Sequence, residues 1–214
     1  MLTVPIQSFA DVLGFYGITH NSPGNPAIGE NQFTVDIKDP GGGEVLFTFY
    51  NSGPAKSTIS EIYFDDGSLL GISSIVEIPV YNNQTKEGVD FTAGDVSINP
   101  KNLPGGTNIT PVFEVTQYFW AEAENPAPKK GIDPGEVLDI YFKLKDNYSY
   151  NDVLLALPMP DDTANGLRIG LHAISMGVTE ESESFVNNPV PIPGGIWLLA
   201  SSLLCIAGLR KRNK

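Results

Sequence analysis

The segment Glu136–Leu144 reads EVLDIYFKL and alternates along its whole length. The even-numbered positions from Leu138 to Leu144 are all apolar, whereas the odd-numbered positions include Asp139 and Lys143. Successive residues of an extended chain point to opposite faces of a sheet. The segment therefore predicts a strand with one buried face.

The same two-residue period recurs elsewhere and predicts three more strands, at Asn31–Lys38, Val45–Tyr50 and Leu167–Ile174. Val112–Trp120 is apolar and aromatic enough to predict a further strand. Gly- and Pro-rich turns such as Pro40–Gly43 separate these segments. Short strands broken by such turns favour an all-β fold, and we expect an antiparallel β-sandwich or jelly-roll-like body.

One turn signal is specific enough to predict a strand pairing. Asp66-Gly67 is a dipeptide that tight type I′ turns prefer, because it tolerates positive φ angles. It lies between Thr58–Phe64 and Leu69–Val76, both of which have strand-like composition. The sequence therefore predicts a β-hairpin formed by these two segments.

Helical periodicity is scarce in this chain. Ser8–Phe15 and Tyr150–Leu157 each predict one short helix, because an Asp-Val-Leu run follows a capping residue in both. The capping residue is Ser8 in the first segment and either Ser149 or Asn151 in the second. We therefore expect one or two short helices beside the strands.

Composition argues against several functional classes. The 214 residues include 25 acidic and 13 basic side chains, which give a net charge of −12 at pH 7. This charge argues against nucleic-acid binding, which requires clustered Lys and Arg. The one cysteine, Cys205, excludes an intrachain disulfide and a Cys-based zinc site.

The C-terminal end differs from the rest of the chain. No Asp or Glu follows Glu183, and the segment Ile196–Leu209 carries no charge. As a helix it would be roughly 21 Å long, which is shorter than the ~30 Å hydrocarbon core of a bilayer. Trp197 at its start and the basic residues after it nevertheless favour a membrane helix with a cytoplasmic C-terminus. The main apolar residues of this expected helix are Ile196, Trp197, Leu198, Leu199, Leu203, Leu204, Ile206 and Leu209, and the basic residues that follow are Arg210, Lys211, Arg212 and Lys214.

A proline-rich motif precedes the apolar segment and consists of Val190, Pro191, Ile192, Pro193, Gly194 and Gly195. The order of a Pro-x-Pro motif, an apolar helix and a basic end resembles the PEP-CTERM sorting signal of the Val-Pro-Leu-Pro type. This resemblance covers residues 190–214. It implies that an exosortase, a membrane-embedded cysteine transpeptidase of Gram-negative bacteria that make exopolysaccharide, recognises and removes the signal. Parts of the body are similar to uncharacterised PEP-CTERM proteins, for which no activity is implied; these parts are Thr19–Asn21, Ala27–Glu30, Val45–Phe49, Asn51–Pro54, Ile62–Gly67 and Leu167–His172.

These observations divide the chain into five parts. We expect an N-terminal segment at 1–18, the β body at 19–184, a Pro/Gly linker with the sorting motif at 185–195, the membrane helix at 196–209 and a basic cytoplasmic tail at 210–214.

Export requires an N-terminal signal, but Met1–Gly17 has no Lys or Arg and an interrupted apolar run. We interpret the sequence as starting after that signal, either through a start codon placed too late or through truncation. Two alternatives for the tail remain: a helix packed on the body and a permanent membrane anchor.

The candidate chemical groups are few. His20 and His172, the latter expected on an outward strand face beside Arg168, are interpreted as surface or structural residues, because lone histidines rarely bind transition metals. The nucleophile-elbow, metalloprotease, P-loop and dinucleotide motifs are all absent from the sequence. Weak calcium candidates lie at two expected loops, because loop carboxylates supply the oxygen ligands that Ca²⁺ takes; they are Asp65, Asp66, Asp161 and Asp162.

Aromatic side chains suggest one further role. Tyr118, Phe119 and Trp120 are adjacent, so at least one should face outward from a strand, and Tyr148 and Tyr150 form a second pair. Exposed aromatic rings stack on sugars, although core packing also explains such residues.

The sequence therefore predicts a non-catalytic, cofactor-free protein that is exported through the inner membrane and processed by an exosortase. Its expected destination is the cell surface or an exopolysaccharide matrix. The alternatives are a carbohydrate- or calcium-binding β-sandwich module with a permanent membrane anchor, and a small hydrolase with paired carboxylates in a cleft.

Overall fold

A computed structural model describes residues 11–66, 72–77, 88–94, 102–116, 119–145, 147–157 and 166–188. The expected sorting motif, membrane helix and basic tail at 190–214 lie outside these residues, as do Asp161, Asp162 and Tyr118. Within the described ranges, the structure contains no helix of the length and apolar character needed to cross a membrane.

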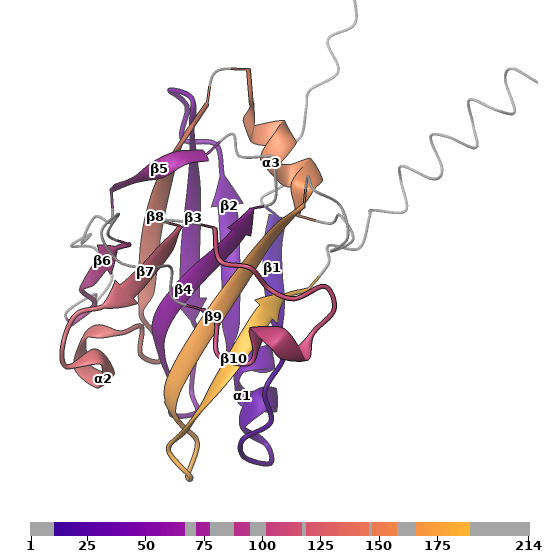
Figure 1. Cartoon of the computed structure of the whole chain (residues 1–214). Helices are drawn as coiled ribbons and strands as arrows, with labels where there is room; N and C mark the ends of the chain where they lie inside the picture. Colours follow the sequence, from indigo (N-terminus) through magenta and orange to yellow (C-terminus); the bar gives the residue numbers. More distant parts are fainter. Residues whose placement is uncertain are drawn as a thin grey trace, which may run out of the picture.

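The described residues form one antiparallel sheet of ten strands (Figure 1). The strands are β1 Asp11–Gly17, β2 Phe33–Lys38, β3 Glu44–Asn51, β4 Thr58–Asp66, β5 Ile72–Glu77, β6 Phe91–Ala93, β7 Trp120–Ala123, β8 Val137–Leu144, β9 Leu167–Met176 and β10 Glu181–Asn187. Their order across the sheet is β5-β8-β3-β2-β1-β10-β9-β4-β7-β6. The fold is therefore mostly β, as the alternating segments predict.

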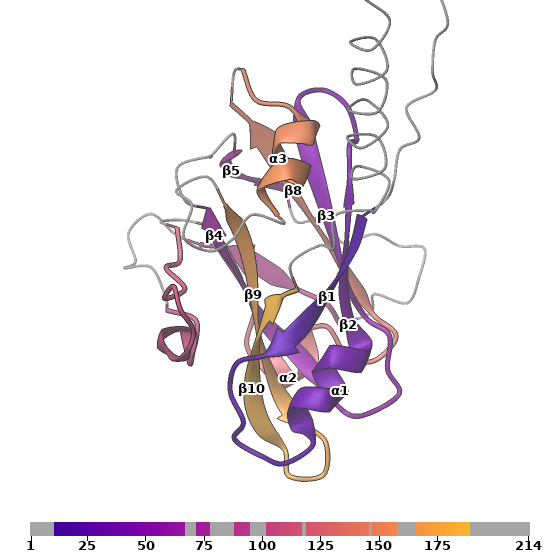
Figure 2. The ribbon, with the colours of Figure 1, turned by 90° about the vertical axis from the view of Figure 1, so that its right-hand side faces the viewer.

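Strand β1 joins two halves of this sheet. Its residues 11–14 pair with β2, whereas residues 15–17 pair with β10. The sheet curls at this strand, so that the first half (β5, β8, β3 and β2) faces the second half (β10, β9, β4, β7 and β6), as Figure 2 shows. The main hydrophobic core draws its residues from both halves.

Phenylalanine rings connect the two halves inside the core. The ring of Phe64 on β4 lies 4.7 Å from that of Phe142 on β8 and 5.5 Å from that of Phe47 on β3, measured between centroids. Both contacts are edge-to-face, the geometry that the ring quadrupole favours, and each contributes about 0.5–1.5 kcal/mol beyond area burial. All three rings are fully buried.

Short helices lie at the two ends of the core (Figure 2). α3, Tyr150–Ala156, begins after Ser149, whose backbone N–H and hydroxyl both donate to the Asp152 carboxylate at 2.7 Å. The Tyr150 hydroxyl donates to the carbonyl of Ile37 at 2.8 Å, which ties α3 to the first half. α1, Asn25–Gln32, lies at the opposite end beside β1 and β10. A four-residue helix α2, Ala127–Lys130, and a 3₁₀ turn η1, Gly106–Asn108, complete the described elements.

The structure confirms most of the alternating segments. β2, β3, β8 and β9 lie within or overlap the four predicted strands, and their apolar sets face the core. The predicted helix at Tyr150–Leu157 is also confirmed, with Ser149 as its capping residue.

The helix predicted at Ser8–Phe15 is wrong, because residues 11–17 form β1. Pairing with β2 and β10, together with burial of Leu13 and Phe15, overrides the local capping pattern. The folded body therefore begins no later than Asp11, inside the segment that we expected to precede it.

The predicted hairpin around Asp66-Gly67 is also wrong. β4 pairs with β9 and β7, whereas β5 pairs with β8 in the other half of the sheet. Turn propensity acts only locally, whereas the apolar residues on both faces of β4 place it inside the second half.

Among the described residues of the strand predicted at Val112–Trp120, only Trp120, the first residue of β7, lies in a strand. Residues 112–116 form no strand and instead cross the outer face of the second half. There Phe113 and Leu103 pack in a second buried cluster with Tyr63 and Trp120. The apolar composition of the segment therefore reflects burial without strand pairing.

The contact between the two halves yields a stability prediction. Replacing Phe64 by Ala removes the ring that meets Phe47, Phe49 and Phe142. We expect the free energy of unfolding, measured by urea titration, to fall by about 3–5 kcal/mol. Val12→Ala, at a side chain that is 60% exposed, is the control and should change it by less than about 0.5 kcal/mol. An equal effect of the two substitutions would contradict this account of the core.

Candidate functional site

A β-bulge in β4 determines which side chains reach the outer face of the second half. Ile59 pairs with Ala173 and Glu61 pairs with His172, so Ser60 is an extra residue on β4. Ile59 therefore faces the core while Glu61, two residues later, faces outward. The Ser60 hydroxyl donates to the carbonyl of His172 at 3.1 Å and fixes the bulge.

Cross-strand pairing then aligns five polar residues from five neighbouring strands. In order across the sheet they are Ser184 on β10, His172 on β9, Glu61 on β4, Glu122 on β7 and Thr92 on β6. Directly opposed residues of an antiparallel pair have Cβ atoms about 4.5–5.5 Å apart, so each of these side chains neighbours the next.

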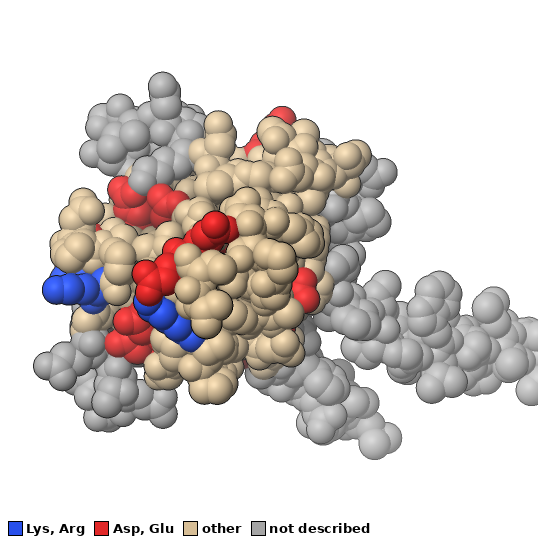
Figure 3. Space-filling view, turned by 90° about the horizontal axis from the view of Figure 1, so that it is seen from below, with Lys and Arg blue, Asp and Glu red and all other residues tan. Residues whose placement is uncertain are grey.

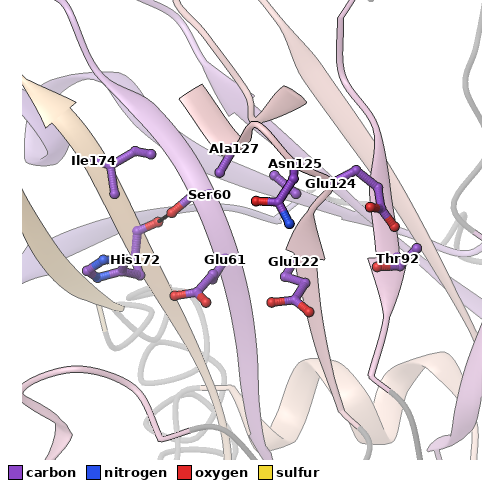
Figure 4. Close-up of a pocket in the computed structure, with 10 residues that line it drawn as sticks. Ser60, Glu61, Thr92, Glu122, Glu124, Asn125, Ala127, His172 and Ile174 are labelled. Atoms are coloured by element: carbon purple, nitrogen blue, oxygen red, sulfur yellow. Dashed lines mark hydrogen bonds between the residues drawn. The ribbon is translucent and has the colours of Figure 1, made fainter. Parts of the chain in front are cut away.

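Four of these residues line an open pocket of about 400 Å³ (Figure 4). The side chains of Glu61, Glu122 and His172 lie side by side along its floor, and Thr92, Glu124 and Asn125 lie at the β6–β7 end. Ser60, Ala123, Ala127 and Ile174 complete the described part of the lining, which includes three carboxylates.

The protonation states of His172 and Tyr63 follow from their surroundings. Burial lowers the pKa of His172, and the charge of Glu61 partly opposes this effect. His172 Nδ1 lies 3.2 Å from the Ser184 hydroxyl. Burial, followed by the charge of Glu61, raises the pKa of Tyr63, so its hydroxyl remains protonated at neutral pH. The imidazole is therefore neutral at neutral pH.

Ser184, His172 and Glu61 together resemble the residue set of a hydrolytic triad. The Ser184 side chain, however, is fully buried, and its backbone N–H donates to the Thr19 hydroxyl at 2.8 Å. A nucleophile must reach its substrate, and this hydroxyl faces only protein atoms. We conclude that the three residues position the floor of the pocket.

The predicted calcium candidates Asp65 and Asp66 lie on opposite faces of β4 and do not form one site. Asp65 pairs with Arg168 on the outer face and accepts a hydrogen bond from the backbone N–H of Glu114 at 2.9 Å. Asp66 points toward the core side and is only 2% exposed. Among the residues that the structure describes, no cluster of three or more His, Cys, Asp or Glu side chains is suited to a metal ion.

Asp66 is the most strongly perturbed carboxyl group among the described residues. Burial raises its pKa from 3.8 to about 7; the charge of Lys145 opposes this shift and that of Asp65 adds to it. Its Oδ1 atom has no hydrogen-bond partner among the described residues. Asp66 is therefore a buried group that protonates near neutral pH, on the face of β4 opposite the pocket.

Other sequence candidates have structural roles. Arg168 lies on the same outer face as His172, as expected, and donates to the carbonyls of Pro111 and Val112 at 2.9 and 2.7 Å. Phe119 faces the core, and Trp120 is 2% exposed beneath the segment 102–116, so neither offers a surface for sugar stacking. Tyr150 is engaged with Ile37, and His20 is exposed in a loop.

The sequence did not reveal the carboxylate pair of the pocket. Glu61 and Glu122 are 61 residues apart in sequence, so nothing local connects them. The bulge at Ser60 also shifts the two-residue alternation of β4, so this alternation does not predict which face of the sheet Glu61 lies on. Of the residues in the pocket, the sequence predicted only the outward position of His172, from the two-residue period of β9. Comparison of the chain with models of protein families, with curated proteins and with solved structures finds no match.

The buried Asp66 predicts how stability depends on pH. Between about pH 4 and 7 the folded chain keeps a proton that the unfolded chain has released, so stability should fall as pH rises through this window. Asp66→Asn removes the ionisation. By urea titration we expect the variant to exceed the wild type by about 2–4 kcal/mol at about pH 8, with little difference at about pH 4.

Glu124→Gln is the control for this measurement, because Glu124 is an exposed carboxylate. Its stability difference from the wild type should be small at both pH values. A difference between Asp66→Asn and the wild type that does not vary with pH would contradict the assignment of a buried, protonated carboxyl group.

Proposed function

We propose that this chain is an exported, acidic, non-catalytic protein of the cell surface or of an exopolysaccharide matrix, bearing a C-terminal signal that an exosortase recognises and cleaves. In this proposal residues 190–195 are the sorting motif, residues 196–209 are a single membrane-spanning helix and residues 210–214 are its cytoplasmic end. The precursor resides in the inner membrane until it is cleaved. The body is of the β-sandwich, jelly-roll-like type, formed by the curled sheet.

The observation that carries this proposal is where the sheet ends. β10 lies in the interior of the sheet between β1 and β9 and ends at Asn187, three residues before Val190. Every strand pair of the described sheet joins residues between 11 and 187. Cleavage at 190–195 would leave all of these pairings intact, as a removable sorting signal requires.

The charge distribution supports the same proposal. Without Arg210, Lys211, Arg212 and Lys214 the rest of the chain carries a net charge of −16. Carboxylates are spread across the end of the molecule that Figure 3 shows, whereas basic groups lie toward one side of that view. Such a body repels nucleic acid and anionic polysaccharide unless divalent cations bridge them.

The hydrolase alternative receives less support from the geometry. A glycosidase uses a carboxyl group with a raised pKa and a second carboxylate on opposite sides of one cleft. Here Asp66, with its raised pKa, and the pocket residues Glu61 and Glu122 lie on opposite faces of the sheet.

A second candidate function, favoured by the pocket, is a carbohydrate-binding module. The pocket volume of about 400 Å³ falls in the range typical of small-ligand sites, and its polar side chains supply hydrogen-bonding groups. This function is compatible with export, and it also applies to a body held by a permanent membrane anchor.

Intact-mass analysis of the surface fraction from the native host tests the proposed processing. We expect a mature species that lacks Arg210–Lys214, because the exosortase removes the helix and the basic end. A variant with Pro191→Ala and Pro193→Ala should accumulate as the full-length precursor in the membrane fraction. Pro189→Ala, outside the motif, is the matched control and should be processed normally. A surface species that retains its basic end would exclude processing and leave the permanent anchor.

A further inference from the structure

We propose that the α3 end of the body, residues 147–156, rests on the phospholipid headgroups of the inner membrane while the chain is still attached to its C-terminal helix. This inference rests on the proposed function, because it needs residues 196–209 to lie in the bilayer. It adds the orientation of the body and the surface that meets the lipid. The observations that carry it are the direction in which the chain leaves the sheet, the length of the linker and two exposed apolar side chains.

The chain leaves the sheet in the direction of α3. β10 is antiparallel to β1, so a chain that continues along β10 runs toward the first residues of β1. Beyond β10, the backbone N–H of Asn188 donates to the carbonyl of Gly14 at 2.9 Å. From there β1 continues to Asp11, which pairs with Ile37, and the Ile37 carbonyl accepts the hydrogen bond from Tyr150 of α3. Three residues of β1, about 10 Å, therefore separate the exit point from the level of α3.

The linker between the exit point and the expected membrane helix is short. It comprises the seven residues 189–195. At 3.3–3.6 Å per residue it spans at most about 25 Å, of which roughly 15 Å remains once the chain has passed the start of β1. The headgroup layer on each side of the hydrocarbon core is about 5–8 Å thick. The linker therefore holds the α3 end within about 10 Å of the headgroups, which is less than the diameter of one helix.

The opposite end of the body lies out of this reach. α1 and the β9–β10 hairpin lie there (Figure 2). β10 begins at Glu181, six residues before Asn187, so this end is about 20 Å behind the exit point. A linker that turned back would have about 5 Å left, too little to cross the headgroup layer. Figure 3 views the molecule from this end and shows carboxylates across it, which an anionic bilayer repels.

The α3 end presents two apolar side chains to solvent. Leu155 on α3 is 62% exposed, and Tyr148, just before the helix, is 38% exposed. Val153 and Ala156 of the same helix are buried in the main core, so Leu155 is not needed for packing α3 on the sheet. Leucine side chains on a surface helix insert at the boundary between headgroups and acyl chains, and tyrosine rings favour the headgroup level.

The charges around α3 permit contact with an anionic bilayer. At the ends of β2, β3 and β8 and on α3, the described charged side chains are Lys38, Asp39, Glu44, Lys143, Lys145 and Asp152. The three lysines offset the three carboxylates, so this end lacks the repulsion that the acidic body as a whole would produce. A weak contact is sufficient, because the membrane helix makes it intramolecular and the short linker gives it a high effective concentration.

Fluorescence quenching on the full chain tests this inference. The chain is reconstituted into vesicles of phosphatidylethanolamine and phosphatidylglycerol that contain a lipid with a spin-labelled headgroup. In a Cys205→Ala background, a fluorophore is attached to Asn151→Cys or, as the matched control, to Val178→Cys. Position 151 lies one turn before Leu155 on the same helix face, whereas Val178 is 100% exposed in the β9–β10 hairpin. We expect the lipid to quench the label at position 151 severalfold more strongly than the label at position 178.

Substitutions show which side chains make the contact. In the chain labelled at position 151, Tyr148→Ser with Leu155→Ser should lower the quenching about twofold or more, because the apolar groups that insert are lost. Val178→Ser removes an exposed apolar side chain at the far end and should leave the quenching unchanged. Unchanged thermal melting of the variants verifies that they fold. Unchanged quenching in the double variant would overturn the inference.

The other outcomes separate this inference from the proposed function. If alkaline carbonate released the chain from the vesicles, residues 196–209 would not form a membrane helix, and the proposed function would fall together with the inference. If the chain stayed in the vesicles but both labels were quenched equally, the α3 end would not face the lipid, and only the inference would fall. Quenching at position 151 that appeared only after an exosortase was added would replace the lipid by the enzyme as the partner of this surface.

Discussion

The architecture depends on one constraint: a single sheet must bury the apolar face of each half against the other. Phe64 on β4 meets this constraint by packing against Phe142 and Phe47 across the core, at ring distances of 4.7 and 5.5 Å. β1 makes the arrangement possible, because it pairs with β2 along one part of its length and with β10 along the other. α3 and α1 then cover the two ends of the core, where the curled sheet alone would leave apolar side chains exposed.

The outer face of the second half is divided between a covered region and an open one. At Gly170 a Cβ atom would come within 2.8 Å of Leu103 and 3.0 Å of Phe113, so the missing side chain lets the segment 102–116 lie directly on β9. Arg168 holds the same segment through two backbone carbonyls. The segment buries Tyr63 and Trp120, and the pocket lies on the part of this face around Glu61. Tyr63 lies at the border of the two regions, because it packs under the segment 102–116 while the charge of Glu61 contributes to the raised pKa of its hydroxyl.

The residues also explain how much of this structure the sequence could predict. Strands β3 and β8 were predictable because one face is fully buried and the other is mostly half-buried or exposed. Apolar residues therefore recur at every second position of both strands. β4 was wrongly paired with β5. Both faces of β4 are buried, so its residues show no alternation, and the turn signal that follows it carries no information about strands that are distant in sequence. β1 was mistaken for a helix because its pairing partners are distant in sequence. The pocket was not predictable, since the bulge at Ser60 and the register of three strands determine which carboxylates meet.

The position of the carboxylates matters more for the local electrostatic field than the net charge of the chain does. The net charge of −16 outside the basic end is spread over a domain whose surface groups are screened beyond about 8 Å at physiological ionic strength. Diffuse repulsion therefore discriminates only weakly between matrices. Glu61 and Glu122 are cross-strand neighbours in a concave pocket, where screening is weaker than at the open surface. Charges that share one pocket therefore interact more strongly than the same charges spread over the surface, so the strand register that sets Glu61 beside Glu122 has a larger electrostatic effect than their share of the net charge indicates.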